Sequence, residues 1–310
     1  MEINGQQWLY VKDRFLGRGR VYCLPDNSQY LRVGPIEKIA AEVAFLRQLN
    51  NYNFPVPKII NQGEYDNFGY YIEESVGQFS FGDRFRQEYL VNGRVSSETF
   101  SNYCKMSIRF LVAQFKSAKD ANGISTNELR KGICVDNVVT ENPDISVDYL
   151  NDVLSKVENK LKVLPLSLTH GDFSPFNVFN NGVVDFEHNF IGPIGYDVLT
   201  GPLYESFWDY KESNGESQLL FCFSEEQLVY YFNQINQVAA HYGISDFSVF
   251  KDSFLLLKAI WLLSYEKQLA GELGSNLRWN FRKAILKYFL SWYLDNKPID
   301  TKVFKKLVSN

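Results

Sequence analysis

The chain has 310 residues, of which 45% are hydrophobic, and its formal net charge is −4. This length allows one large domain or two modest domains with a real core, and the acidic balance argues against a nucleic-acid-binding protein. The longest apolar run, Phe254 to Leu263, is interrupted by Lys258 and falls well short of the roughly 20 residues that a membrane span needs, so no membrane partner is expected.

The first ten residues lack the basic stretch followed by an apolar core that is typical of a secretory signal. The cysteines are scattered without a C-x-x-C pair, which favours buried reduced thiols over a zinc site. They are Cys23, Cys104, Cys134 and Cys222. We therefore expect a cytoplasmic protein.

Three strands are predicted near the amino terminus, at residues 8–15, 21–24 and 29–33, and they form an antiparallel meander. Gly17 and Gly19 lie between the first two. Glycine lets backbone amides come close to a ligand such as a nucleotide phosphate. A G-x-G between strands is also common in a plain hairpin, so the pattern alone leaves both interpretations open.

A helix is predicted from Ile36 to Leu49, because Pro35 suits the start of a helix and apolar residues recur on one face. That buried face consists of Ile36, Ile39, Ala40, Val43, Leu46 and Leu49. Glu42 falls inside it, where a carboxylate is costly unless a positive group meets it. The alternative is a surface pair with Lys38, four residues earlier.

Two further strands are predicted, one starting at Lys58 and one covering residues 70–77, with a turn at residues 66–69. Helices are predicted from Phe79 to Leu166 and from Ser224 to Val308. Neither region contains a catalytic pattern, and most of their aromatic residues are expected in the core. Some of these aromatic residues could line a pocket for a small molecule together with Tyr204, Trp208, Asp209 or Glu266. The aromatic residues at helix-like spacings are Trp261, Tyr265, Trp279, Trp292 and Tyr293.

The chemically richest stretch runs from Leu168 to Asp197. Asp172 and Asn177 lie five residues apart with Pro175 between them, so the intervening segment must be a loop. Two short strands, residues 176–179 and 183–186, follow around a turn at Asn180-Asn181-Gly182, and together they predict a hairpin.

The length of the turn decides which side chains meet. A two-residue turn at Asn181-Gly182 would pair Val178 with Asp185, whereas a three-residue loop closed by Gly182 pairs Asn177 with Asp185. We favour the three-residue loop, which brings an amide oxygen and a carboxylate together beside Asp172. Such hard oxygen ligands suit Mg²⁺. The alternative is that the acid and the amide only cap the turn.

These residues carry a resemblance to a known family. The segment His170-Gly171-Asp172-Phe173-Ser174-Pro175-Phe176-Asn177, with Asp185-Phe186-Glu187 after it, resembles the catalytic loop and metal-binding triplet of the aminoglycoside phosphotransferase and choline kinase superfamily. Protein kinases carry H-R-D and D-F-G in these places and an A-P-E segment downstream. Gly171, Glu187 and the lack of A-P-E favour the small-molecule branch over a protein kinase.

The resemblance implies an α+β, bilobal protein-kinase-like fold. Residues 1–75 would form a small nucleotide-binding lobe with an antiparallel sheet and one main helix. Residues 76–310 would form a larger, mostly helical lobe that carries catalysis and acceptor binding.

The resemblance also implies roles for particular residues. Asp172 would be the catalytic base, and Asn177 and Asp185 would bind Mg²⁺. Arg32 stands where kinases carry the lysine that contacts the nucleotide phosphates. It would pair with Glu42, with Arg47 as a competing partner and a solvated strand residue as the alternative for Arg32.

The remaining implied roles concern the support of the site. Gly17 and Gly19 would form the phosphate loop, and the segment Glu73, Glu74 and Ser75 would form the hinge whose backbone holds the nucleotide base. His170 would orient the catalytic loop, Asp197 would brace it through backbone hydrogen bonds, and Glu187 would lie near the metal ions.

The expected function is an ATP-dependent kinase, using ATP or another nucleoside triphosphate and Mg²⁺, with a small-molecule hydroxyl acceptor. The alternative is a nucleotide-binding regulatory module without transfer activity, which Arg32 and the arginines of the glycine loop, Arg18 and Arg20, keep open. Neither the acceptor nor the oligomeric state can be read from the sequence. Acceptors of the aminoglycoside, choline or ethanolamine, homoserine and sugar types fit this pattern, and the charge and aromatic lining around Asp172 would discriminate among them.

Overall fold

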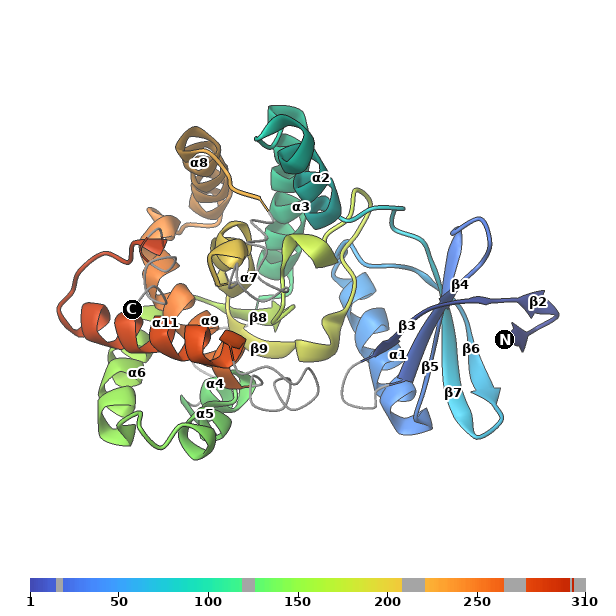
Figure 1. The fold of residues 1–310 in the computed structure, drawn as a ribbon, viewed down its shortest axis with the longest axis horizontal. Helices are drawn as coiled ribbons and strands as arrows, with labels where there is room; N and C mark the ends of the chain where they lie inside the picture. The colour runs from blue at the N-terminus through green and yellow to red at the C-terminus, as the bar shows by residue number, and fades with distance from the viewer. Residues whose placement is uncertain (15–18, 119–125, 208–220, 265–276, 302, 304–310) are drawn as a thin grey trace.

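A computed structural model describes residues 1–14, 19–118, 126–207, 221–264, 277–301 and 303. An antiparallel sheet with one long helix forms one lobe, and a larger helical region forms the other (Figure 1). Several residues singled out from the sequence lie outside the described ranges, namely Gly17, Trp208, Asp209, Tyr265 and Glu266. No described helix has both the length and the hydropathy needed to cross a membrane.

The amino-terminal sheet has five antiparallel strands in the order β3-β4-β5-β7-β6. Their bounds are β3 (Leu9–Arg14), β4 (Gly19–Cys23), β5 (Gln29–Gly34), β6 (Ile59–Tyr65) and β7 (Phe68–Glu74), preceded by the short pair β1 (Glu2–Ile3) and β2 (Gln6–Gln7). The predicted meander of the first three strands is confirmed. Strand β7 is inserted between β5 and β6, which makes it a central strand.

Helix α1 (Ile36–Asn51) begins directly after Pro35, as predicted, and lies between the sheet and the helical lobe (Figure 1). Its buried side chains are Ile39, Val43, Leu46 and Leu49. It packs closely against β7, because a Cβ added at Gly69 would lie 3.0 Å from the Ile36 Cα. The helix therefore holds its inward face, including Glu42, against the sheet and the cleft.

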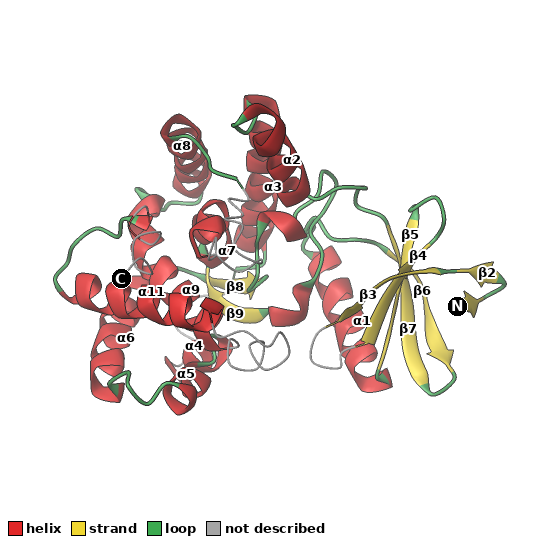
Figure 2. Cartoon of the chain, viewed as in Figure 1, coloured by secondary structure: helices red, strands yellow, loops and turns green. Residues whose placement is uncertain are grey.

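The second lobe is built from helices, drawn in red in Figure 2. They are α2 (Phe81–Asn92), α3 (Ser97–Lys116), α4 (Thr126–Gly132), α5 (Val135–Glu141), α6 (Val147–Leu161), α7 (Tyr196–Thr200), α8 (Glu225–His241), α9 (Lys251–Ser264) and α11 (Leu277–Leu294), with 3₁₀ turns η4 (Gly201–Phe207) and η5 (Phe247–Phe250). Helix α9 is buried along its length from Ser253 to Ser264. It is the core element against which the neighbouring helices pack.

A two-stranded ribbon, β8 (Leu166–Thr169) and β9 (Phe190–Pro193), carries the chemically rich stretch between its strands. The predicted hairpin of residues 176–179 and 183–186 is wrong in its form. Only one bridge is present, between Val178 and Val183, and the flanking residues form 3₁₀ turns, η2 (Pro175–Asn177) and η3 (Phe186–His188).

The predicted register of this hairpin is wrong as well. The Phe179 N–H donates to the Gly182 carbonyl, so the loop is the two residues Asn180 and Asn181, and Asn177 lies opposite Val184. Gly182 is not in the left-handed region. The turn is fixed instead by tertiary contacts, because the Asn181 N–H donates to the Val76 carbonyl and the Val183 N–H donates to the Pro55 carbonyl.

Gly19 has a steric reason to be glycine, whatever its role toward a ligand. Its φ is +120°, and an added Cβ would lie 1.9 Å from the Val33 carbonyl oxygen on the neighbouring strand. We expect Gly19→Ala to lower the free energy of unfolding by about 3 kcal/mol or more, because the strand pair must separate. Chemical denaturation of the purified variant measures this change.

Gly5→Ala is the matched control. Gly5 also has a positive φ, +72°, but an added Cβ there meets nothing within 4 Å. Only the backbone strain remains, which costs about 1–2 kcal/mol. Equal losses in the two variants would contradict the steric explanation for Gly19.

Candidate active site

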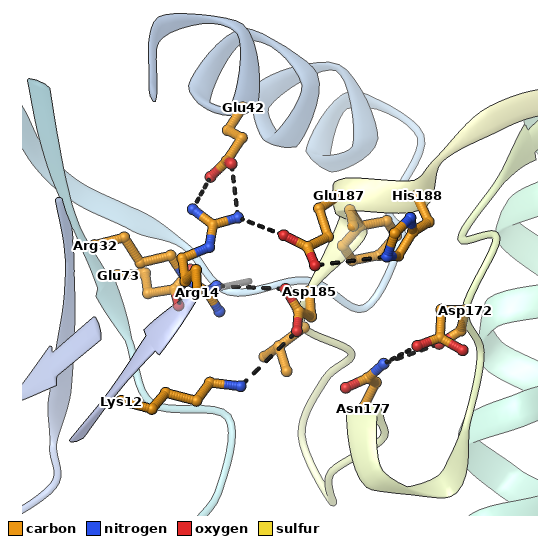
Figure 3. Close-up of polar contacts among 12 residues, drawn as sticks. Lys12, Arg14, Arg32, Glu42, Glu73, Asp172, Asn177, Asp185, Glu187 and His188 are labelled. Carbon is orange, nitrogen blue, oxygen red and sulfur yellow. Dashed lines mark hydrogen bonds and ion pairs between the residues drawn. The ribbon is translucent and has the colours of Figure 1, made fainter. Parts of the chain in front are cut away.

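The loop after β8 presents Asp172 in a fixed geometry. The Asn177 Nδ2 donates to the Asp172 carbonyl at 2.9 Å and to the Asp172 Oδ2 at 3.2 Å, and the Ser174 N–H donates to the same carbonyl at 2.8 Å. Asp172 and Asn177 are therefore neighbours on one loop, as predicted. In the view of Figure 3, Asn177 lies between Asp172 and Asp185, with its amide oxygen turned away from Asp172.

Asp197 holds the start of this loop from α7. Its carboxylate is fully buried and accepts the His170 N–H at 3.0 Å, the Gly171 N–H at 3.1 Å and the Gln114 Nε2 at 2.9 Å. Burial raises the pKa of Asp197 to about 6, against the opposing effect of these donors and of Lys258. The backbone contacts that the sequence analysis expected of Asp197 are present.

His170 is a neutral, structural histidine in this geometry. Burial lowers its pKa to about 4. Its Nδ1 accepts the Asp172 N–H at 3.2 Å, which leaves Nε2 to donate to the Val184 carbonyl at 2.8 Å. Both ring nitrogens form hydrogen bonds within the chain. His170 therefore connects the loop to Val184, beside Asp185, rather than carrying a proton to a substrate.

Asp185 follows the turn at Asn180-Asn181 and directly precedes η3, and its backbone is in the left-handed region with φ of 71°. Its carboxylate is 3.8 Å from the Arg32 Nη1 and 4.0 Å from the Lys12 Nζ (Figure 3). Burial alone would raise the pKa of Asp185, but Arg32 and Lys12 outweigh it, and the pKa is lowered. Asp185 is thus anionic. A carboxylate and an amide oxygen, such as those of Asp185 and Asn177, are ligands that could hold Mg²⁺, with further ligands from water and phosphate.

The predicted Arg32–Glu42 pair is wrong. Glu42 instead binds Arg14 from β3, with distances of 2.7 Å from Nη2 to Oε1 and 3.1 Å from Nη1 to Oε2. The Tyr71 hydroxyl also donates to Glu42, at 3.2 Å. Neither Lys38 nor Arg47 is its partner in these contacts. The charge inside the apolar face of α1 is met by an arginine that the sequence analysis missed.

Arg32 is bound by Glu73, whose role in the sequence analysis was confined to its backbone. The Arg32 Nε donates to the Glu73 Oε1 at 2.8 Å, and both side chains are buried. The strand register explains the pair: Arg32 lies opposite Tyr71, so Glu73 is its diagonal neighbour on the same face of the sheet. Arginine is long enough to close this diagonal distance.

Arg14 also joins the two lobes. Its Nη2 lies 3.2 Å from the Glu187 Oε2 in η3, so one guanidinium holds an acid of α1 and an acid beside Asp185 (Figure 3). Because Lys12 and Arg14 are two residues apart on β3, they share a face of the sheet. The cleft has a volume of about 460 Å³, and Arg14, Arg32, Glu42, Glu73 and Asp185 are among its lining residues.

The predicted hinge offers fewer donors than expected. The Glu74 N–H donates to the Lys58 carbonyl at 2.9 Å, and the Ser75 N–H donates to the Ser28 carbonyl at 3.0 Å. These two N–H groups are already used by the lobe itself. A nucleotide base at this segment would therefore need hydrogen-bond donors other than the Glu74 and Ser75 N–H groups.

Lys258 is a further residue that the sequence analysis did not assign to the site. Its side chain on α9 is buried, and its Nζ donates to the Gly171 carbonyl at 2.7 Å and lies 3.4 Å from the Asp172 Oδ1. Burial lowers its pKa to about 8, while Asp172 and Asp197 favour the charged form. A signal was present in the sequence, since a single lysine inside an apolar run needs a partner.

The comparisons with known proteins agree with this architecture. A family model described as the phosphotransferase enzyme family matches residues 20–216, more than half of the chain. No curated protein sequence matches.

Solved structures of similar fold include a putative aminoglycoside phosphotransferase from Ralstonia eutropha JMP134, with 14% identity, a TM-score of 0.58, and coverage of 95% of this chain and 94% of that one. An aminoglycoside-3′-phosphotransferase of type VIII has 16% identity and a TM-score of 0.54, covering 84% and 94%. A thermostable mutant of APH(4)-Ia, in a ternary complex with AMP-PNP and hygromycin B, has 12% identity and a TM-score of 0.53, covering 92% and 93%. At these identities the likeness establishes the fold.

The fold and the loop geometry together define a kinase-like phosphotransferase with two lobes. The chain belongs to the phosphotransferase enzyme family.

The Arg14–Glu42 contact can be tested by a double-mutant cycle. We expect Arg14→Ala and Glu42→Ala to be non-additive in the free energy of unfolding, with a coupling of about 1–3 kcal/mol, because each residue satisfies the other's partly buried charge. Urea denaturation of both single variants and the double variant provides the coupling.

The comparison cycle uses Arg32→Ala with Glu42→Ala, because these two side chains form no hydrogen bond or ion pair with each other in the described part of the chain. We expect their effects to add within about 0.5 kcal/mol. A larger coupling in the Arg32 cycle than in the Arg14 cycle would contradict the Arg14–Glu42 pair and support the Arg32–Glu42 pair that the sequence predicted.

Glu205 provides a pH prediction. It lies on η4 beside Tyr204, is 7% exposed, and has no hydrogen-bond partner among the described residues. Burial raises its pKa from 4.5 to about 8. Between these two values the folded chain keeps a proton that the unfolded chain loses, so the free energy of unfolding falls as pH rises.

Glu205→Gln removes this dependence. We expect the variant to gain stability relative to the parent between pH 5 and pH 8, by about 1.4 kcal/mol per pH unit where the difference in protonation is complete. Thermal or urea unfolding at several pH values measures the gain. Parallel stability curves for the two proteins would show that Glu205 is not a buried neutral acid.

Proposed function

We propose that the chain is an ATP-dependent small-molecule kinase that transfers the γ-phosphoryl group to a hydroxyl of a small acceptor, with residues 1–75 binding the nucleotide and residues 76–310 carrying catalysis. The supporting observation is the loop in which Asn177 donates to Asp172 while Asp185 remains anionic in the adjoining cleft. The family membership favours transfer over a module that only binds nucleotide. A structural relative that was solved in complex with AMP-PNP supports an adenine nucleotide as the donor.

In this proposal Asp172 accepts or orients the proton of the acceptor hydroxyl. Asn177 and Asp185 hold Mg²⁺, which would neutralise charge on the nucleotide phosphates when bound. The chain contributes position and charge, because the transferred phosphoryl group is loosely bonded at the transition state. Arg32 and the glycine loop contact the phosphates, and the segment from Glu73 to Ser75 adjoins the base.

The electrostatics of the cleft agree with a polyphosphate ligand. Arg14 and Arg32 line it from β3 and β5, and Lys12 of β3 approaches Asp185, which also lines it. Each of these three cations already contacts an acid. Lys12 is the most exposed of the three, with 60% of its side chain accessible, so its ammonium is the one that can turn to a phosphate without breaking a buried pair. The acids keep the cationic side chains extended into the cleft.

The decisive variant is Asp172→Asn. Removing a positioned base lowers turnover by at least about 10²-fold, while nucleotide affinity should change little because Asp172 is not among the cleft-lining residues. Magnesium-dependent phosphoryl transfer from ATP to a panel of small hydroxyl compounds measures the first quantity, and titration with a fluorescent ATP analogue measures the second.

Asp144→Asn serves as the control, since Asp144 is an exposed acid bound to Lys283 and Lys287. Its turnover should match that of the parent. If Asp172→Asn phosphorylates at the parent rate, the assignment of the base is wrong. If the parent consumes no ATP with any acceptor, the transfer function itself is wrong.

A further inference from the structure

Lys258 is a buried cation that the proposed chemistry does not yet use. It is 1% exposed, and every other residue of α9 from Ser253 to Ser264 is uncharged. Burying an ammonium is costly unless hydrogen bonds and opposite charge compensate it. The cost is met here at the catalytic loop, where the Nζ reaches two successive residues, the Gly171 carbonyl and the Asp172 carboxylate.

Three aromatic rings surround the same ammonium. The Nζ lies 3.9 Å from the centroid of Trp261, 5.3 Å from that of Tyr204 and 5.6 Å from that of Tyr196. These rings come from α9, η4 and α7, so the cage is formed by three separate elements. Such a cage is the environment that binds alkylammonium ligands by cation–π attraction. In this chain it already holds the protein's own ammonium.

The cage also contacts η3, the turn that follows Asp185. The Trp261 ring packs edge-on against His188 of η3, with centroids 5.0 Å apart. Asp172 on one side and the segment that follows Asp185 on the other are therefore connected through one lysine and one tryptophan. A change in this unit would alter the place where the acceptor hydroxyl must meet Asp172.

We propose that Lys258 is a positioning and specificity-determining residue, which fixes Asp172 through the Gly171 carbonyl and excludes acceptors with an ammonium group next to the reacting hydroxyl. The proposal rests on the kinase function proposed above. It follows that this end of the acceptor is neutral or anionic, because a cationic group would meet a cage that is filled and a charge of its own sign. The acceptor class then lies with uncharged polyols and hydroxy acids, and not with choline-like alcohols.

The first test uses three variants of Lys258. Lys258→Ala empties the cage, Lys258→Met keeps the volume without the charge, and Lys258→Arg keeps the charge. Lys258→Ala and Lys258→Met should lower kcat by about 10²-fold with little change in KM for ATP, since misplacing a reacting group costs about this much. Added methylammonium should restore Lys258→Ala by about tenfold or more, because the free ion refills the cage, and should not restore Lys258→Met.

Lys251→Ala is the matched control on the same helix. Lys251 also makes a cation–π contact, 5.8 Å from the Phe232 centroid, and pairs with Asp252 at 3.8 Å, but it does not touch the loop. Its kcat should equal that of the parent. A parent-like kcat in Lys258→Met, or a loss in Lys258→Ala that methylammonium leaves unchanged, would overturn the positioning role.

The second test needs no activity. Choline and methylammonium should raise the Tm of Lys258→Ala in a concentration-dependent way, because they bind the emptied cage only in the folded state, and should leave the parent unchanged. Stabilisation of the parent by choline, or phosphorylation of choline by the parent, would overturn the exclusion of cationic acceptors. So would the absence of any shift in Lys258→Ala.

The two tests separate this inference from the function on which it rests. If the parent shows no ATP turnover while choline still stabilises Lys258→Ala alone, the kinase proposal fails and the assignment of the cage stands. If turnover is present and depends on Asp172 while the Lys258 variants behave like Lys251→Ala, the kinase proposal stands and the role of Lys258 fails.

Discussion

The buried carboxylate of Asp197 is the constraint on which the site depends. It is inaccessible to solvent, yet it gathers three donors from the strand end after β8 and from α3. The hydrogen bonds compensate for the burial of this negative charge. Displacement of the loop would therefore leave the Asp197 carboxylate in the core without its backbone donors, which is costly. Lys258 contacts the same loop at the carbonyl of Gly171, the residue whose N–H donates to Asp197. The position of Asp172 therefore follows from two oppositely charged groups buried beneath it.

The cleft shows how an arginine at position 32 affects the pairing of the neighbouring charges. With arginine at position 32, the planar guanidinium reaches the diagonal acid on β7 and leaves Glu42 to another partner. Arg14 fills that place from β3 and reaches Glu187 as well. The link between helix α1 and the sheet is thus kept, although a different strand supplies the cation. The cleft contains the charged residues that the sequence singled out, Arg32, Glu42 and Asp185, but Arg32 and Glu42 have other partners than expected.

The sequence analysis succeeded where local pattern decides structure. The meander, the start of α1 after Pro35 and the Asp172–Asn177 loop all follow from proline, turn residues and apolar spacing. It failed where contacts with distant segments of the chain determine the structure. The turn at Asn180-Asn181 is set by two carbonyls that each lie more than a hundred residues away in the sequence, those of Val76 and Pro55. The partners of Glu42 and Arg32 depend on a strand register that no single sequence displays. Lys258 was visible as an anomaly in an apolar run, but its target lies 86 residues away in sequence.

The attachment of that turn bears on how the molecule can move. The Asn181 N–H donates to the carbonyl of Val76, which lies between β7 and α2, and the Val183 N–H donates to the carbonyl of Pro55, which lies between α1 and β6. A rotation of the sheet about these contacts would leave the stretch from Asn177 to Asp185 in place. Lys12, Arg14 and Arg32 would then move with the sheet. The distance between Asp172 and Asp185 would stay the same while the cleft opens or closes around a ligand.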